Sequence, residues 1–234
     1  LAVQETPRIL AALEDYFGQP YPFAKLDLIA VPEFWAGAME NPGAITYADN
    51  VLLLDPTATS TAQRKAQVRI TAHELAHMWF GDLVTLAWWD DMWLNESFAD
   101  WMGDKITDRL MPDLHHRWSG LEASQDIMAS DARPSTEPIR LPAENGDDAM
   151  RTVGLAYNKG KAVLAMFEQW MGPETFRRGI RGYLKEHRWK NAVAGDLWAA
   201  LDRVSGRQVA EAMRGYIEQR GHPLVTVEPL AGGS

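Results

Sequence analysis

Two histidines four positions apart, His73 and His77, stand in the stretch ITAHELAHMWFGDLVT, which covers residues 70–85. This spacing places both imidazoles on one face of a helix, in line with apolar residues, and Glu74 directly follows the first of them. A buried imidazole without a partner costs about 1–3 kcal/mol, and a divalent cation bound by both rings removes that cost. The HExxH pattern therefore predicts a metal-binding helix. The alternative is an ordinary helix with two hydrogen-bonded core histidines.

Glu96 is the candidate third ligand, nineteen positions after His77 in the segment MWLNESFADWMGDK. A catalytic zinc site needs three protein ligands and an open position for water, and a carboxylate from a second helix would complete the set. The alternative, a solvated helix carboxylate, fits poorly because large apolar side chains surround it: Trp93, Leu94, Phe98 and Trp101. Asp100 lies one helical turn further and could hold a ligand histidine through a hydrogen bond.

The composition limits the chemistry that the chain can perform. None of its 234 residues is a cysteine, so disulfides and thiol nucleophiles are excluded, and any metal must be held by His, Asp or Glu. The chain has 23 basic and 32 acidic residues, a net charge of −9, and no Lys/Arg cluster, so nucleic-acid binding is not expected. The acidic balance favours a cationic ligand such as the free amino end of a peptide. No run approaches eighteen apolar residues, and no membrane span is expected.

The elements that must position these side chains fall into two groups. Short apolar runs broken by Pro and Gly predict strands at 25–31, 43–47 and 50–55, after a helix at about 7–17. The helix with the two histidines is expected over 61–80, capped by Ser60 or Thr61 and ended by Gly81. Further helices are predicted at 94–110, 112–130, 158–171, 173–188, 195–204 and 206–220, with a surface loop at 131–152 and a β-like run at 222–228.

Three motifs, in this order, resemble the zinc aminopeptidase family typified by aminopeptidase N. GAMEN, residues 37–41, is similar to that family's exopeptidase signature. HELAHMWFGDLVT followed by WLNESFAD matches the family's HExxH-x18-E spacing from His77 to Glu96. AYNKG places Tyr157 where the family has its transition-state tyrosine. The motifs together cover about residues 37–160.

The resemblance implies a role for each of these residues. The ligands of one zinc ion per chain would be His73, His77 and Glu96. Glu74 would take a proton from water, and Tyr157 would stabilise the oxyanion of the reaction. The implied reaction is zinc-dependent hydrolysis of the N-terminal peptide bond of peptides.

The GAMEN residues would bind the substrate. Glu40 would hold its α-ammonium group and so restrict cleavage to the first residue. The backbone of Gly37 and Ala38 would line the peptide in an extended pose, and Met39 and Asn41 complete the binding segment.

The implied fold is the thermolysin-like catalytic domain, an α+β fold that spans residues 1–225. A small mixed sheet lobe, about 1–80, would precede a mainly helical lobe, about 81–225, with zinc in the cleft between them. Residues 226–234 would be a tail that begins a further domain. The family's proteins carry other domains around the catalytic one, so the expected partners are peptides with a free N-terminus and the other domains of the full-length chain. The sequence leaves the compartment open.

Two departures from the family pattern affect the site. Ser97 stands where relatives more often have glycine. Gly103 stands seven positions after the third ligand, where many relatives carry an acid, and Asp104 follows it. The partner of the ligand histidine therefore remains open between Asp100 and Asp104.

Two other functions compete with the aminopeptidase. A related protein with the same zinc site is an epoxide hydrolase, which would need a long, narrow, apolar pocket. Other relatives have lost the zinc site and serve as scaffolds. The second alternative for this chain is therefore a scaffold or a catalytically weak fragment. The intact set of metal and catalytic groups argues against a scaffold.

Overall fold

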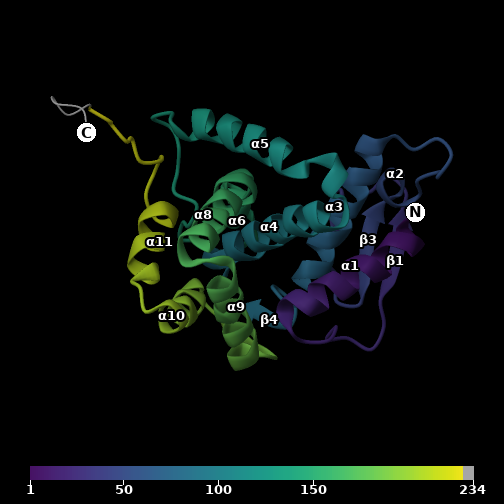
Figure 1. The fold of residues 1–234 in the computed structure, drawn as a ribbon, viewed down its shortest axis with the longest axis horizontal. Coiled ribbons are helices and arrows are strands. Elements are labelled where there is room, and N and C mark those ends of the chain that lie inside the picture. The colour runs from purple at the N-terminus through teal and green to yellow at the C-terminus, as the bar shows by residue number, and fades with distance from the viewer. Residues whose placement is uncertain (229–234) are drawn as a thin grey trace.

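The computed structural model describes residues 1–228, apart from the side chains of residues 117–119. It has two parts: a small sheet with one long helix near the N-terminus, and a larger group of helices that extends to the C-terminal end (Figure 1). This arrangement confirms the α+β class expected from the sequence, with a small mixed sheet followed by a mainly helical region.

The small sheet has the order β1-β3-β2. β1 (Asp27–Val31) runs parallel to β3 (Ala44–Ala48), and β2 (Ala38–Met39) pairs with β3 in the antiparallel direction. Side chains alternate along a strand, and Ile45 and Tyr47 of β3 are fully buried. β2 lies at the edge, so half of its backbone groups have no partner among the described strands.

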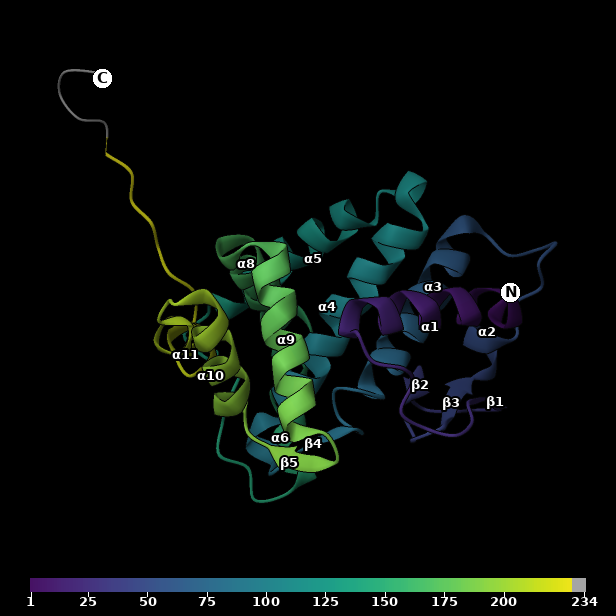
Figure 2. The same cartoon turned by 60° about the horizontal axis from the view of Figure 1, so that its bottom comes forward.

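Eleven α-helices and three shorter turns surround or follow this sheet within the described part of the chain. Figure 2 shows α1 and α3 beside the sheet and α9, α10 and α11 at the opposite end. The helices are α1 (Ala2–Phe17), α2 (Asp49–Leu52), α3 (Thr61–His77), α4 (Met92–Leu110), α5 (His116–Asp131), α6 (Gly146–Met150), α7 (Val153–Leu155), α8 (Lys161–Met171), α9 (Pro173–His187), α10 (Ala194–Ser205) and α11 (Val209–Ile217). The turns are 3₁₀ helices at Trp89–Asp91 and Pro112–Leu114 and a π-helix at Ala156–Gly160.

α3 begins as the sequence predicts and ends earlier. Ser60 caps it in a capping box, in which the Ser60 hydroxyl accepts from the Gln63 amide at 3.2 Å and Gln63 accepts from the Ser60 amide at 3.0 Å. The helix stops at His77, three residues before the expected end. There the backbone changes to wider turns, in which the amide of Asp82 donates to the carbonyl of His77. Gly81 follows with a φ of 134° and turns the chain away.

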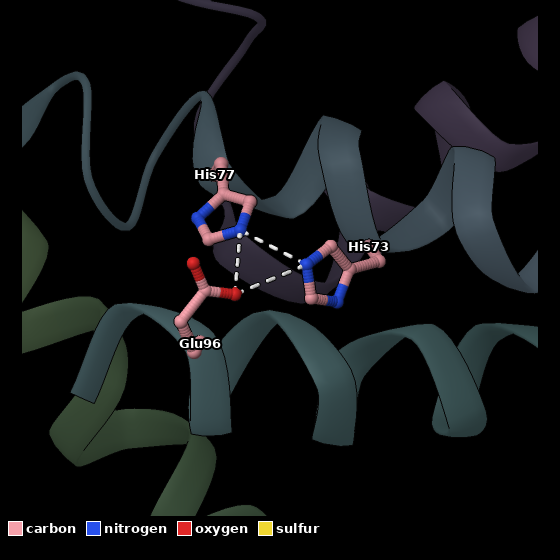
Figure 3. A group of neighbouring side chains, drawn as sticks. All are labelled: His73, His77 and Glu96. Carbon is pink, nitrogen blue, oxygen red and sulfur yellow. Dashed lines mark hydrogen bonds and ion pairs between the residues drawn. The ribbon is translucent and has the colours of Figure 1, made fainter. Parts of the chain in front are cut away.

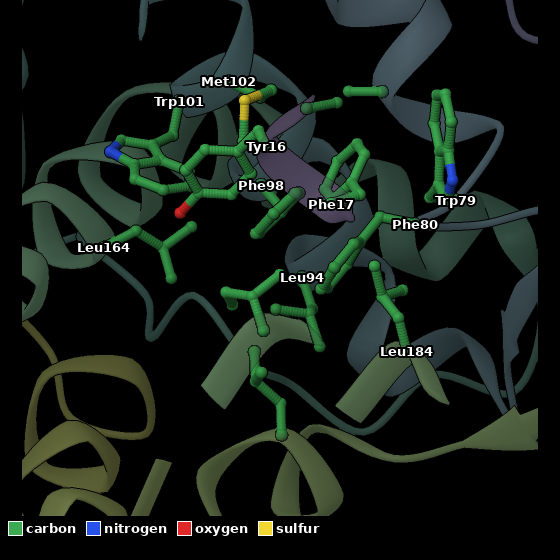
Figure 4. Close-up of a cluster of buried hydrophobic side chains, with 14 of the residues drawn as sticks. Tyr16, Phe17, Trp79, Phe80, Leu94, Phe98, Trp101, Met102, Leu164 and Leu184 are labelled. Atoms are coloured by element: carbon green, nitrogen blue, oxygen red, sulfur yellow. The ribbon is translucent and has the colours of Figure 1, made fainter. Parts of the chain in front are cut away.

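The core lies where α3 and α4 pack against α1, α8 and α9 (Figure 4). Phe80 stacks on Phe98 with ring centroids 3.6 Å apart, which fixes the end of α3 against the middle of α4. Trp93 and Trp101 of α4 are buried in this core. Trp88 and Trp89 lie before α4 and are 56% and 44% exposed, so neither packs the two helices together.

The structure corrects several sequence-based element predictions. The expected strand at 50–55 is wrong, because residues 49–52 form α2 instead. The strands β4 (Val84–Leu86) and β5 (Lys190–Ala192) were not predicted, and they pair in parallel. The expected loop at 131–152 contains α6. Residues 222–228 form no strand, and the part of the expected tail at 229–234 lies outside the described residues. No helix among the described residues is long and apolar enough to cross a membrane.

Candidate metal centre and cleft

Two packed helices bring the three predicted ligands together. His73 and His77 are on α3, and Glu96 reaches them from α4 (Figure 3). The two Nε2 atoms lie 3.1 Å apart. Glu96 Oε2 lies 3.4 Å from His73 Nε2 and 3.7 Å from His77 Nε2. Among the described residues this is the group of His, Asp and Glu side chains whose ligand atoms converge closely enough for one metal ion.

The hydrogen bond at Nδ1 of each imidazole leaves Nε2 of that ring available to bind a metal. His77 Nδ1 lies 3.1 Å from the Phe80 carbonyl, which can only accept, so this Nδ1 carries the proton. His73 Nδ1 lies 3.2 Å from Asp100 Oδ1 and donates to it in the same way. Both Nε2 atoms therefore present lone pairs to each other and to the Glu96 carboxylate. Three acceptors that face one another repel unless a cation lies between them, and two imidazoles with one carboxylate form a donor set that suits zinc.

The charges around the histidines attract positive charge to this point. Burial by itself lowers the pKa of His73, but Asp100 and Glu96 outweigh burial and raise this pKa to about 9. Burial is likewise outweighed at His77, where the Glu40 and Glu96 carboxylates raise the pKa to about 10. The two imidazoles in turn hold the pKa of Glu96 below its usual value, although burial opposes this. A metal ion and a proton compete for the same lone pairs in such a cluster.

The partner of His73 is Asp100. Asp100 Oδ1 also accepts from Arg69 at 2.6 Å, and its other oxygen lies 3.2 Å from Lys161 Nζ. Asp104 contacts Arg69 at 2.7 Å and Lys161 at 2.9 Å, and no contact between Asp104 and His73 is present among the described atoms. The sequence left the partner of His73 open between Asp100 and Asp104, and the structure shows that it is Asp100.

Glu74 is buried beside the three candidate ligands. Its side chain is part of the cleft wall, and Oε2 has no hydrogen-bond partner among the described residues. Burial raises the pKa of Glu74 to about 7, against the opposing effect of the neighbouring histidines. A carboxylate with a pKa near neutrality and a free oxygen can accept a proton and release it again.

Tyr157 lies on the π-helix at residues 156–160, a wider turn that the sequence did not predict. Its ring centroid is 5.9 Å from that of His73. Burial and the nearby Glu96 carboxylate raise the pKa of Tyr157 above its usual value, so the phenol keeps its proton at neutral pH. A protonated phenol beside the metal ligands is a hydrogen-bond donor.

The first two residues of the GAMEN segment line the cleft. Gly37 and Ala38 line a cavity of about 440 Å³ together with His73, Glu74 and Tyr157. The remaining GAMEN residues, Met39, Glu40 and Asn41, are not in the cavity wall. The charge of Glu40 nevertheless raises the pKa values of His77 and Glu74, so this carboxylate lies within electrostatic reach of the metal ligands. Asn41 instead donates from Nδ2 to Thr46 Oγ1 at 3.2 Å.

Other residues of the cleft were not singled out from the sequence. Ala36, Arg69, Ile70 and Asn158 also line it. Arg69 stands four positions before His73, so the helical spacing that identified the histidines would have placed it on the same face. The contact of Lys161 with Asp100 could not be predicted from the sequence, because it depends on how α8 packs against α4.

Residues 1–216 match the family that is described as peptidase family M1 domain. The chain belongs to peptidase family M1. Aminopeptidase M1-A of Oryza sativa subsp. japonica is 37% identical over 228 residues, which is 97% of this chain and 26% of the rice protein. The tricorn protease-interacting factor F2 of Thermoplasma acidophilum is 42% identical over 217 residues, 92% of this chain and 28% of that protein.

A third relative in family M1 is the glutamyl aminopeptidase of Bitis rhinoceros. It is 38% identical over 239 residues, 97% of this chain and 24% of the snake protein. The chain thus spans about a quarter of the length of the curated relatives that it matches. The family match includes the α3–α4 pair, β2 and the π-helix, so all parts of the cleft lie within the matched residues.

Proposed function

We propose that residues 1–225 form the catalytic domain of a zinc-dependent aminopeptidase. The observation that carries this proposal is the convergence of three lone-pair donors from α3 and α4. One of them, His73, also lines a cleft together with Glu74, Tyr157 and Ala38 of the edge strand β2. The names of relatives in rice and in Bitis rhinoceros, both aminopeptidases, support the same reaction.

His73, His77 and Glu96 would hold the zinc ion, with Asp100 orienting His73 and the Phe80 carbonyl orienting His77. When bound there, zinc supplies Lewis acidity, which lowers the pKa of water and polarises a substrate carbonyl. The chain itself supplies the groups that move protons and hold the substrate.

Glu74 would carry the proton between the two halves of the reaction. Its unpartnered Oε2 is available to accept a proton from water, and its raised pKa allows the same carboxyl to donate that proton to the leaving amine.

Tyr157 would stabilise the negative charge that develops on the carbonyl oxygen. Its phenol is protonated at neutral pH and lies in the same cavity wall as His73 and Glu74. A donor that is already in place needs little reorganisation when the charge appears, which is why removal of one such donor from an enzyme slows it about 10²–10³-fold.

β2 and Glu40 would orient the peptide. The carbonyl of Gly37 accepts from the amide of Ala48, and Met39 pairs with Thr46, so the alternation of an antiparallel ladder turns the amide and carbonyl of Ala38 away from β3. An extended peptide can pair with these free groups as an added strand. Glu40, next on the same segment, would bind the α-ammonium of the first residue and so select peptides with a free N-terminus.

The test combines metal analysis with turnover of an aminoacyl arylamide. The purified protein should contain about one zinc ion per chain and release the arylamine. Glu96→Ala should lose zinc and turnover together, and Glu186→Ala, an exposed glutamate paired with Arg203, should lose neither. A chain that hydrolyses the arylamide equally well after removal of zinc, or a Glu96→Ala variant with full zinc content, would contradict the proposal.

A further inference from the structure

The π-helix that carries Tyr157 rests directly on the residue next to the third metal ligand. Ser97 follows Glu96 on α4 and is fully buried. Its hydroxyl donates to the carbonyl of Ala156, the first residue of the π-helix, at 2.7 Å. Glu96 precedes Ser97 in the chain, and Tyr157 follows Ala156. The hydrogen bond between Ser97 and Ala156 therefore links the backbone next to Glu96 with the backbone next to Tyr157.

The other end of the π-helix contacts the same serine. A Cβ built on Gly160 would overlap Ser97 Oγ and lie 2.8 Å from Ser97 Cβ, whereas the next nearest atom, on Trp93, is 3.7 Å away. Only glycine fits at this point while Ser97 is present. Ser97 therefore occupies the space beneath the turn, and it is in contact with both the first and the last residue of the π-helix.

A π-turn is stabilised by an additional hydrogen-bond donor from a side chain. The α-helical ladder joins residues four apart, and a π-turn shifts that pattern by one residue at the cost of poorer hydrogen-bond geometry. A side chain that inserts a hydrogen bond into the ladder stabilises such a shift. The hydroxyl of Ser97 is placed to do so, 2.7 Å from the Ala156 carbonyl.

We propose that Ser97 is a positioning residue for Tyr157: its hydrogen bond to Ala156 holds the π-helix at the register that directs the phenol toward the metal ligands. This inference rests on the proposed function, because it gives Tyr157 its role in the reaction. Ser97 touches neither substrate nor metal in this account and acts only through the turn.

The turn has other attachments, so that loss of Ser97 shifts it without unfolding it. Lys159 is buried, lies 2.9 Å from Asp131 and donates to the Gly221 carbonyl at 2.7 Å. Lys161, directly after the turn, bridges Asp100 and Asp104. Removal of the Ser97 hydroxyl is therefore expected to change the position of Tyr157 rather than the fold.

The first experiment measures kcat and KM of the zinc-loaded protein with an aminoacyl arylamide. Ser97→Ala should lower kcat about three- to tenfold, the scale of one neutral hydrogen bond, with KM and zinc content unchanged. The matched control is Thr107→Val, which removes another buried hydroxyl-to-carbonyl bond of α4, 2.7 Å long, and should leave kcat unchanged. A Ser97→Ala variant with wild-type kcat overturns the proposal.

A double-mutant cycle separates positioning from a structural effect on the metal site. In a Tyr157→Phe background, Ser97→Ala should cause no further loss of kcat, because the group that it positions has been removed. The same loss in both backgrounds would show that Ser97 acts through Glu96 and would overturn the proposal.

A steric exchange tests the packing of the turn. Gly160→Ala should lower Tm and kcat sharply, because the new methyl group overlaps Ser97. Addition of Ser97→Gly removes the overlap and should restore Tm, but kcat should return only to the level of Ser97→Ala, because the hydrogen bond is still missing. Full recovery of kcat in this double variant would contradict a role for the hydrogen bond.

Hydrogen exchange gives a readout that does not depend on activity. The amides of residues 157–161 should exchange faster in Ser97→Ala than in the wild-type protein and in Thr107→Val. If the wild-type protein has no peptidase activity, the proposed function fails while this measurement still tests the turn. Unchanged exchange in Ser97→Ala would overturn the inference even in an active enzyme.

Discussion

His73 Nδ1 lies 3.2 Å from Asp100 Oδ1, on the side of the ring opposite the nitrogen that faces His77 and Glu96. This contact determines which nitrogen carries the proton and therefore which one is available for a metal. Arg69 contacts the same Oδ1 atom at 2.6 Å, and Lys161 Nζ lies 3.2 Å from the other oxygen of this carboxylate. The orientation of a metal ligand on α3 thus depends on charges contributed by α4 and α8.

Asp100→Asn should weaken zinc binding, because an amide is a poorer acceptor for His73 Nδ1 and can turn its NH₂ group toward the ring. The expected loss is about 10–100-fold in zinc affinity, measured by competition with a chromogenic chelator. Asp104→Asn is the matched control, since it removes a carboxylate of the same charge cluster that does not touch His73. Equal losses in the two variants would show that the cluster acts through its total charge and not through the Asp100 contact.

Glu74→Gln should retain zinc and abolish turnover. The glutamine side chain has nearly the same shape as glutamate and leaves the three ligands in place, but it cannot accept the proton from water. Elemental analysis of this variant should therefore show the zinc content of the wild-type protein, while kcat on an aminoacyl arylamide falls to zero. Measurable turnover close to that of the wild-type protein would remove Glu74 from the mechanism.

Tyr157→Phe should lower kcat about 10²–10³-fold with little change in KM, because the lost donor acts on charge that appears only in the transition state. Tyr16→Phe is a suitable control: this phenol is also buried, its oxygen has no partner among the described residues, and it lies on α1. Zinc content should be the same in both variants. A wild-type kcat in Tyr157→Phe would make Tyr157 a structural residue.

Glu40→Gln should raise KM for peptides with a free amino end, because it replaces a charge-assisted hydrogen bond of about 1.5–3 kcal/mol with a neutral one. The expected increase is about tenfold or more, measured with a dipeptide series. N-acetylated peptides should be poor substrates of the wild-type protein. Equal cleavage of free and acetylated peptides would indicate an endopeptidase and contradict the role given to Glu40.

Asp104 should make the stability of the protein depend on acid pH. Burial raises the pKa of Asp104, but the hydrogen bond to His116 and the cations Arg69 and Lys161 outweigh burial and lower it. A carboxyl group with a lowered pKa stabilises the fold above its unfolded value of about 3.9 and loses this contribution as the pH falls. With Asp100 beside it, Asp104 belongs to a cluster from α3, α4, α5 and α8.

In the presence of EDTA, Asp104→Asn should therefore unfold at a lower urea concentration than the wild-type protein at pH 7. The difference in free energy of unfolding should shrink as the pH falls below about 4, because the carboxyl of the unfolded chain then takes up a proton that the folded carboxyl does not. A difference that stays constant over this range would show that Asp104 contributes through packing and not through its charge.

Local spacing determined the part of the site that lies within one helix. Residues four apart on a helix are neighbours whatever the surrounding fold, so the pairing of His73 with His77 and the position of Glu74 between them could be predicted from the sequence. The cap of this helix could be narrowed to Ser60 or Thr61 from the sequence, and the structure has Ser60, in a capping box with Gln63. Glu96 could be selected as the third ligand by its spacing and apolar flanks, together with the family resemblance.

Tertiary packing decided what the sequence left open. The choice of Asp100 over Asp104 depends on the position of α4 along its axis relative to α3, because both aspartates lie on the same face of α4 one turn apart. The contact of Phe80 with Phe98 fixes this position. The short apolar run at 50–55 does not distinguish a strand from a helix, and α2 follows from its place beside the sheet. β4 and β5 pair across about a hundred residues. The π-helix under Tyr157 has no sequence pattern of its own, because its register depends on a hydroxyl from another helix.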